Sequence, residues 1–172
     1  MFSGKTSEVL SYVRRMRAIG RQVLVVNHAL DDRGGDPAVC SHDQVRAAGT
    51  LSLTRLDDDA LWEQARLHDA VVVDEAQFFG PELVEAARRL VAMGKDVLVV
   101  GLDGDHQQRP FGHLRDLLPL ADEFSKLRAF CAVCRDGTPA PFTRRTVGGG
   151  HGQVLVGGAE SYEPVCRSHL EN

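Results

Sequence analysis

The sequence predicts an α/β fold in which helices cover both faces of a parallel sheet. Three short apolar runs, at residues 22–26, 70–74 and 97–102, alternate with segments whose apolar residues recur at helical spacing. Within each run successive positions are apolar, as in strands that are buried on both faces. The chain has 172 residues, of which 43% are hydrophobic and 26% charged, which is enough for one sizeable core.

The first half of the chain is predicted to hold two helices around a strand and a loop. Four apolar residues at helical spacing predict a helix over residues 6–20, with Gly20 as its C-terminal stop. The strand at 22–26 then runs into a loop over 31–37 that is rich in Asp and Gly. A weaker helical pattern covers residues 58–68.

The second half of the chain changes character near Lys126. Before it, Pro81 at the first helical position, Glu82 in the first turn and Gly94 beyond the end predict a helix over 81–93. After it, cysteine and glycine become frequent. We therefore expect a larger domain over residues 1–125 and a small metal-binding lobe over residues 126–172.

Composition argues against two classes of partner and indicates a compartment. The 20 basic and 24 acidic residues give a net charge of −4 without a basic stripe, so nucleic acid is not an expected partner. No apolar run approaches the roughly 18 residues of a membrane-spanning helix. The amino terminus does not read as a secretory signal, so we expect a cytoplasmic location and reduced cysteines.

Ser3, Gly4, Lys5 and Thr6 open the first predicted helix. A phosphate-binding loop places backbone N–H groups, a lysine and a Mg²⁺-binding hydroxyl at such a helix start. The full motif needs another glycine five positions before Gly4, which would lie before Met1, so the chain holds only its second half. An ordinary helix start remains the alternative at this point.

Asp74 and Glu75 follow an apolar strand directly. P-loop proteins place one Asp near Mg²⁺ at this edge of the sheet, so Asp74 would support the metal. Glu75 would take the proton from an attacking hydroxyl, with its proton affinity raised by burial and by its anionic neighbour. The alternative is a solvated acidic turn. A lysine loop and an acid-tipped strand in one α/β chain together favour phosphoryl transfer.

Two chelating pairs predict a zinc site in the C-terminal lobe. Cys131-x-x-Cys134 and Cys166-x-x-His169 are separated by 31 residues, and each spacing allows two side chains to converge on Zn²⁺. Four protein ligands leave no position for a reactive water, so the zinc is expected to be structural. A disulfide is disfavoured in a reducing compartment, and no role is assigned to Cys40.

These pieces, in this order, resemble the type II thymidine kinases over nearly the whole chain. The resemblance rests on five ordered motifs, at residues 1–6, 74–79, 101–104, 109–112 and 157–162, the last leading to Cys166. It implies a RecA-like P-loop domain with a small zinc lobe. It also implies transfer of the γ-phosphoryl of ATP to the 5′-hydroxyl of thymidine, with Mg²⁺, in nucleotide salvage, by a homotetramer.

The resemblance assigns roles to single residues. Glu75 is implied as the base on the 5′-hydroxyl, and Thr6 and Asp74 as the residues that hold Mg²⁺. The residues implied to face ATP and its phosphates are Ser3, Gly4, Lys5, Thr6, Asp31, Arg33, Asp74 and Gln77. For Asp31 and Arg33, a solvated loop pair is the alternative.

The resemblance also implies a thymidine site built from apolar and aromatic contacts and from a glycine-rich lasso loop. Its residues are Met1, Phe79, Leu102, His106, Phe111, Gln153, Leu155, Gly157 and Tyr162. His106 departs from the family, which usually has Phe at this place. Phe78 is expected to be core instead, since alternate residues after a strand point to opposite sides.

Two alternatives to thymidine phosphorylation remain open from the sequence. The family's first strand and the Gly-Pro that opens its P-loop would precede Met1, so we expect a truncated start without the first strand. Such a chain would be an inactive remnant that serves as a zinc-lobe interaction module. The nearer alternative is a kinase for another deoxynucleoside, such as deoxyuridine, because the family reads thymine largely through backbone groups.

Overall fold

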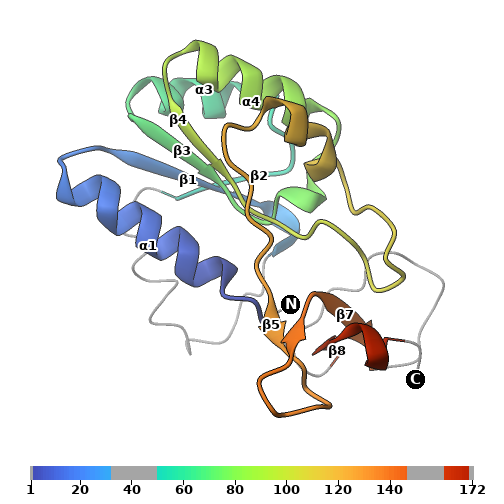
Figure 1. The fold of residues 1–172 in the computed structure, drawn as a ribbon. Helices are drawn as coiled ribbons and strands as arrows, with labels where there is room; N and C mark the ends of the chain where they lie inside the picture. The colour runs from blue at the N-terminus through green and yellow to red at the C-terminus, as the bar shows by residue number, and fades with distance from the viewer. Residues whose placement is uncertain (1, 32–49, 147–160, 171–172) are drawn as a thin grey trace.

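The fold centres on a four-stranded parallel sheet (Figure 1). The computed structural model describes residues 2–31, 50–146 and 161–170. The strands lie in the order β2-β1-β3-β4. Their bounds are β1 (Val23–His28), β2 (Thr50–Leu53), β3 (Ala70–Val73) and β4 (Asp96–Val99). The predicted α/β class with a parallel sheet is confirmed.

Helices cover both faces of this sheet, as predicted. Helix α1 (Lys5–Ala18) lies on one face, and α3 (Asp59–Arg66) and α4 (Glu82–Ala92) lie on the other (Figure 1). The start of α3 is fixed by Asp58, whose Oδ1 accepts the Ala60 N–H at 2.9 Å. The three predicted helices therefore form within a few residues of their expected bounds.

Alternation along the strands divides the apolar side chains between two cores. On β1, Val23 and Val25 pack toward α1, while Leu24 and Val26 pack toward α3 and α4. All four residues of β3 are buried, as expected for a strand that is covered on both faces. Each fully buried Val or Leu contributes about 1.5–3 kcal/mol relative to its exposed state.

Strand β2 was not predicted from the sequence. It pairs in parallel with β1, with Val25 opposite Thr50 and His28 opposite Leu53. As an edge strand it is only partly buried, and its Thr-Leu-Ser-Leu sequence alternates over just four residues. So short an alternation is a weak signal, and the partner strand supplies the rest of the stabilisation.

Short 3₁₀ helices and a second group of strands complete the described chain. The 3₁₀ helices are η1 (Ala29–Asp31), η2 (Ala76–Phe78), η3 (Leu114–Leu120) and η4 (Arg167–His169). The small strands form two antiparallel pairs: β5 (Ala129–Phe130) with β6 (Pro139–Ala140), and β7 (Phe142–Arg145) with β8 (Tyr162–Val165). These strands enclose their own cluster of buried residues. The division of the chain at residues 125 and 126 stays a prediction.

Across the ranges that the structure describes, no helix combines the length and the apolar character needed to cross a membrane.

Candidate active site and metal centre

The acidic pair lies at the carboxyl edge of the sheet, directly after β3. The Asp74 N–H donates to the Val26 carbonyl of β1 at 2.9 Å, and the Ala76 N–H donates to the Val100 carbonyl beyond β4 at 3.0 Å. Glu75 sits between these two bonds in a left-handed conformation, with φ 49° and ψ 39°. Asp74 Oδ1 supports this turn by accepting the Glu75 N–H at 2.8 Å. A non-glycine residue held in this region is typical of functional sites.

Gln77 fixes the position of Glu75. Its Nε2 donates to Glu75 Oε2 at 2.5 Å, and its Oε1 accepts the Leu102 N–H at 2.9 Å. The Gln77 side chain is only 3% exposed, so both bonds are shielded from water. Because the Leu102 N–H can only donate, it orients the amide and directs Nε2 toward the carboxylate.

Two glycines allow the chain to approach Gln77 closely. A Cβ on Gly101 would lie 2.6 Å from Gln77 Oε1, and a Cβ on Gly112 would lie 2.4 Å from the Gln77 carbonyl oxygen. Gly112 also has φ +60°. The segments 101–104 and 109–112, which look separate in the sequence, thus meet at one buried residue, the first at its side chain and the second at its backbone.

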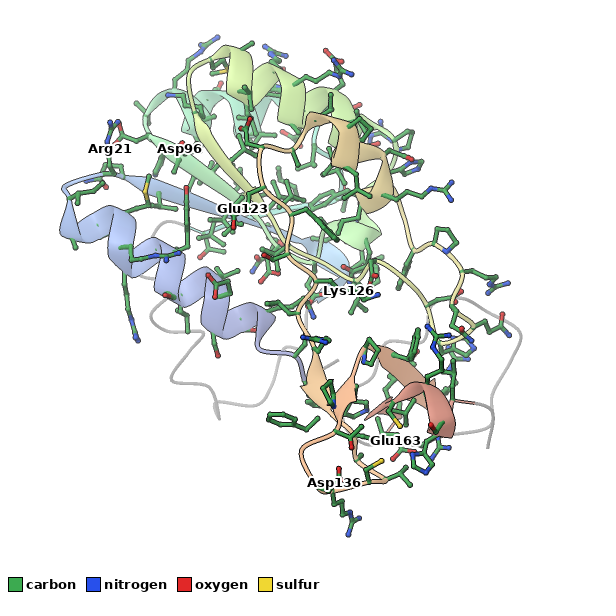
Figure 2. The ribbon with its side chains drawn as sticks, in the orientation of Figure 1. Arg21, Asp96, Glu123, Lys126, Asp136 and Glu163 are labelled. Carbon is green, nitrogen blue, oxygen red and sulfur yellow. The ribbon has the colours of Figure 1, made fainter. Side chains whose placement is uncertain are left out.

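The loop between these two segments is braced by Asp105. Its side chain is 1% exposed, and Oδ1 accepts the N–H groups of Gln107 and Arg109 at 2.8 and 2.9 Å. Its Oδ2 accepts Arg109 Nε at 2.9 Å. Outside the loop, Lys126 Nζ lies 2.5 Å from Asp103 Oδ2, and Figure 2 shows Lys126 on the segment that leads to β5. The residue after Asp105 is therefore presented on a fixed backbone.

His106 is that residue, and its Nδ1 is buried without a hydrogen-bond partner among the residues that the structure describes. Burial lowers the pKa of His106, and the Arg145 guanidinium of β7 lowers it further. Among the nearer loop charges, Asp105 opposes this shift and Arg109 adds to it. His106 is therefore neutral at pH 7, when its ordinary pKa of about 6.5 is taken as the starting point.

Arg145 joins this loop to the small β-hairpin. It lies opposite Tyr162 in the β7–β8 register, and its Nη2 donates to the Tyr162 hydroxyl at 3.1 Å. The guanidinium also lies 5.5 Å from the centroid of the Tyr162 ring. The sequence reasoning missed Arg145, because its neighbourhood depends on pairing between two strands that are far apart in the chain.

The beginning of α1 lies at the same edge of the sheet as the acidic pair. In Figure 1, α1 begins at the end to which the strand arrows point. Gly4 is the N-cap, with φ 85°, and Lys5 is the first residue of the helix. The N–H groups of such a first turn have no acceptor within the helix. Thr6 follows in this turn and is exposed.

The burial of the two aromatic residues after β3 is the reverse of what their expected roles imply. Phe79, expected at the substrate, is 2% exposed and packs in the main core against His28, with ring centroids 4.7 Å apart. Phe78, expected in the core, is partly exposed and contacts the Phe111 ring edge to face at 5.7 Å. The 3₁₀ turn of η2 alters the simple alternation on which the expectation relied.

Several expected site residues lie outside the described part of the chain. These are Met1, Arg33, Gln153, Leu155 and Gly157, together with the side chain of Asp31. Within the described part, the sequence reasoning also missed Asn27, which lies next to the last residue of β1 and opposite Ser52 of β2. Asn27 Oδ1 is buried and has no hydrogen-bond partner among the described residues. The signal in the sequence that could have identified Asn27 is a polar residue directly after four apolar strand residues.

The four predicted metal ligands converge. The ligand atoms of Cys131, Cys134, Cys166 and His169 all lie within 4.8 Å of one another. Cys134 Sγ is 3.8 Å from Cys166 Sγ, and His169 Nδ1 is 3.4 Å from Cys134 Sγ and 3.3 Å from Cys166 Sγ. Tetrahedral Zn–S bonds of about 2.3 Å imply S···S separations of about 3.8 Å. The donor set and its spacing therefore fit zinc.

The surroundings of these ligands favour thiolate at one cysteine in particular. Burial raises the pKa of Cys131, but N–H groups of Cys134, Cys166 and Val133 and the His169 side chain outweigh burial and lower that pKa to about 6. Burial and the neighbouring thiols raise the pKa of Cys134 to about 11. Metal binding would remove that proton, since zinc binds the thiolate form.

Arg144 links the metal cluster to the hairpin. Its Nη1 donates to the His169 carbonyl at 3.0 Å, while Nε and Nη2 donate to Glu163 Oε1 at 3.0 and 2.8 Å. Glu163 lies opposite Arg144 in the strand pairing and is labelled in Figure 2. Cys166 directly follows β8, so the position of the cluster and the register of the hairpin depend on each other.

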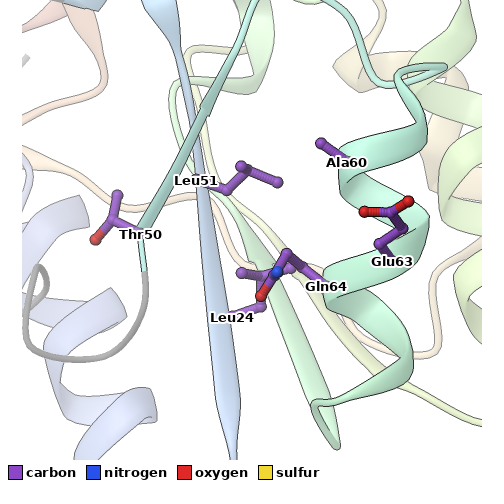
Figure 3. A pocket seen from close by; sticks show the side chains of 6 residues that line it. All are labelled: Leu24, Thr50, Leu51, Ala60, Glu63 and Gln64. Carbon is purple, nitrogen blue, oxygen red and sulfur yellow. The ribbon is translucent and has the colours of Figure 1, made fainter.

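A separate hollow of about 280 Å³ lies between the sheet and α3 (Figure 3). It is lined by Leu24, Thr50, Leu51, Ala60, Glu63 and Gln64. Leu24 is the second residue of β1, whereas the acidic pair follows the end of β3. This hollow is therefore displaced from the carboxyl edge and forms no part of the candidate active site.

Fold and site define an α/β protein of the kind whose ligands bind at the carboxyl edge of a parallel sheet. Comparison with known proteins is more specific. The sequence model of the family described as Thymidine kinase matches residues 1–170. The chain therefore belongs to the thymidine kinase family.

Individual relatives agree with this assignment. The chain is 40% identical to a thymidine kinase of Bdellovibrio bacteriovorus over 99% of its own length and 81% of that protein. It is 39% identical to a thymidine kinase of Deinococcus deserti, over 98% of its own length and 89% of the relative. A thymidine kinase of Coprothermobacter proteolyticus is also 39% identical, over 99% of this chain and 86% of the relative.

Proposed function

We propose that this protein transfers the γ-phosphoryl of ATP to the 5′-hydroxyl of thymidine and yields dTMP for pyrimidine nucleotide salvage, with Glu75 as the base. Membership of the thymidine kinase family makes the chain an ATP-dependent thymidine kinase. The observation that supports the residue assignment is the strained Glu75, held at the carboxyl edge of the sheet by Asp74 and Gln77.

The start of α1 is the proposed phosphate site. Ser3, Gly4 and the first turn offer backbone N–H groups, and Lys5 offers a positive charge to the phosphates of ATP. Thr6 and Asp74 would hold Mg²⁺, which neutralises charge that develops on the transferred group. Asp31 and Arg33 belong to the same proposal through the family resemblance, with Arg33 countering charge on the phosphoryl oxygens.

Glu75 is the proposed acceptor of the 5′-hydroxyl proton. The Gln77 amide donates to Oε2 of its carboxylate and fixes the side chain at the carboxyl edge of the sheet, where the substrate is proposed to bind. As the O–P bond forms, the hydroxyl proton passes to Glu75 and ADP leaves. Gln77 therefore acts in positioning the base, and through Leu102 it connects the base to the loop that is expected to hold thymidine.

The thymidine site is proposed between this loop and the β7–β8 hairpin. Leu102, His106 and Phe111 come from the loop, and Tyr162 comes from the hairpin. Gln153, Leu155 and Gly157 of the lasso and Met1 complete the set that the family resemblance implies. Zinc held by the Cys131 cluster would brace the base of the hairpin. The homotetramer and the cytoplasmic location also remain predictions.

Replacing the base tests the assignment most directly. ADP formation from Mg-ATP should depend on thymidine, and Glu75→Gln should lower kcat by at least about 100-fold, the typical contribution of a general base. Glu85→Gln is the matched control, because Glu85 is an exposed carboxylate on α4. Binding of a fluorescent ATP analogue should survive the Glu75 substitution.

Each outcome separates the alternatives. A Glu75→Gln protein that keeps most of its turnover would overturn the role of Glu75 while leaving the activity in place. Thymidine-independent ADP formation, or faster turnover of deoxyuridine in direct competition, would assign another substrate. A wild-type chain that binds zinc but neither binds nor hydrolyses ATP would support a non-catalytic interaction module instead.

A further inference from the structure

We propose that His106 contributes to recognition of the nucleobase by accepting a hydrogen bond at its Nδ1 atom. The proposal rests on the function proposed above, since it concerns the thymidine site of the same enzyme. It differs from aromatic stacking, which is what a phenylalanine at this place would provide. The structural reason is an imidazole nitrogen that is buried, held in place and without a partner in the described part of the chain.

An unpartnered nitrogen inside a protein costs free energy. Burying a polar group without a hydrogen bond is unfavourable, and buried polar atoms in native proteins are almost always paired. Among the described residues, only a few side-chain atoms share this condition. A ligand that supplies the missing partner recovers the cost on binding.

The backbone around His106 makes this nitrogen a fixed feature. Asp105 accepts three hydrogen bonds from the loop, which continues into the isolated bridge between Gly104 and Pro110. On the other side, Gln77 holds the Leu102 N–H. His106 therefore needs little reordering when a base binds, which favours specific recognition.

Charge around the imidazole keeps it in the form that this role needs. The groups that act on His106 are Arg145 from the hairpin and Asp105 and Arg109 from its own loop. Burial and the two guanidiniums outweigh Asp105, so the ring is neutral at pH 7. In the neutral tautomer that carries its proton on Nε2, Nδ1 can accept the imide N–H of a pyrimidine base, and protonation of the ring removes this acceptor.

The position of the ring agrees with a contact to the base. Arg145 also donates to the Tyr162 hydroxyl, so its guanidinium acts on both His106 and Tyr162. Figure 1 shows the loop after β4 running toward the β7–β8 hairpin. To reach the buried Nδ1, a base that enters between loop and hairpin must move neighbouring groups apart, while Asp105, whose oxygens are already occupied, can stay in place.

A set of four substitutions tests the proposal, with thymidine varied at saturating Mg-ATP. His106→Asn keeps a polar group near the place of Nδ1, His106→Gln keeps one near Nε2, and His106→Phe keeps only the ring. We expect His106→Phe and His106→Gln to raise KM for thymidine about tenfold, the equivalent of about 1.4 kcal/mol. His106→Asn should stay within about threefold of wild type, and kcat should change little in all three.

The fourth substitution, His113→Asn, is the control. His113 is a partly exposed histidine that pairs with Asp116, and its replacement should leave KM unchanged. Melting temperatures of all variants identify any that fail to fold. If His106→Phe or His106→Gln is among them, the KM of His106→Asn for thymidine still tests whether a polar group near Nδ1 is sufficient. An unchanged KM in His106→Phe, or equal rescue by Gln and Asn, would overturn the proposal. Absence of thymidine turnover by wild type would instead overturn the proposed function.

A pH series provides a second readout. Because the pKa of His106 lies below its ordinary value, the neutral ring persists at pH 7 and is lost only as the pH falls further. KM for thymidine should therefore rise on acidification in wild type and stay flatter in His106→Phe. Parallel pH profiles for the two proteins would contradict a hydrogen bond made by this ring.

Discussion

Replacing Gly112 by alanine should disturb Glu75, the proposed catalytic base, from a distance. Gly112 does not touch Glu75, but its α-carbon packs against the Gln77 backbone, and a Cβ would lie 2.4 Å from the Gln77 carbonyl oxygen. Because that contact is with backbone, no side chain can turn away to relieve it. Gln77 must shift, and the bond from its Nε2 to Glu75 must shift with it.

The size of the effect follows from two terms. The left-handed conformation costs alanine about 1–2 kcal/mol, which is partly offset by about 0.4–1 kcal/mol from the stiffer unfolded chain. Overpacking against the Gln77 backbone adds about 1–3 kcal/mol. We therefore expect a total loss of about 2–4 kcal/mol, which at about 2–4 °C per kcal/mol corresponds to a fall in Tm of about 4–16 °C for a chain of this size.

Gly94→Ala is the control that separates the steric contact with Gln77 from the cost of the left-handed backbone conformation. Gly94 has φ +74°, close to the +60° of Gly112, but a Cβ there would meet nothing within 4 Å. The Gly94→Ala variant should lose only the free energy that the left-handed backbone conformation costs alanine, about 1 kcal/mol net, and should keep its kcat. Thermal unfolding and thymidine kinase assays on both variants measure the difference. Equal losses of Tm and kcat in the two variants would refute the packing argument.

Two further predictions concern the metal centre and a surface carboxylate. Removing zinc should raise KM for thymidine more than KM for ATP, because the cluster fixes the hairpin; unchanged constants in protein shown to be zinc-free by elemental analysis would contradict this. Hydrogen bonds from the Gln22 N–H and then from Arg21 lower the pKa of Asp69. Its carboxylate therefore stabilises the folded protein at any pH above its ordinary pKa of about 3.9. This stabilisation is lost as the pH falls through the lowered pKa. Asp69→Asn should therefore lower Tm at pH 7, and this loss should shrink as the pH falls below about 3.9 and through the lowered pKa, whereas Asp122→Asn, at an exposed site, should leave Tm unchanged throughout.

The parts of the fold that the sequence predicted are those with strong local signals. The helices over 81–93 and 6–20 carried apolar periodicity and clear stops, and the strand at 70–74 was apolar throughout. The metal cluster was also predictable, since ligand spacing within each pair is a local property. Strand β2 has only four residues and an exposed edge, so its own sequence carries a weak signal and most of its stabilisation comes from pairing with β1.

The parts that could not be predicted depend on contacts between distant segments. Gln77 was expected near the nucleotide, but its two bonds, to Glu75 and to the Leu102 N–H, follow from how the loop after β4 passes over η2. The burial of Phe78 and Phe79 is the reverse of the expectation because a 3₁₀ turn replaced simple alternation. Arg145 became a site residue only through its pairing with Tyr162.

The hairpin explains how a structural metal can affect substrate binding. One end of the four-residue β7–β8 ladder pairs Phe142 with Val165, next to the ligand Cys166, and the other end pairs Arg145 with Tyr162. A slip of one residue would turn every side chain of a strand to the opposite face, so Tyr162 would turn away from Arg145. Arg145, which helps to keep His106 neutral, would then lose its hydrogen bond to the Tyr162 hydroxyl. Zinc bound at the cluster would thus act on the proposed thymidine site through strand register, and no direct contact between metal and substrate would be needed.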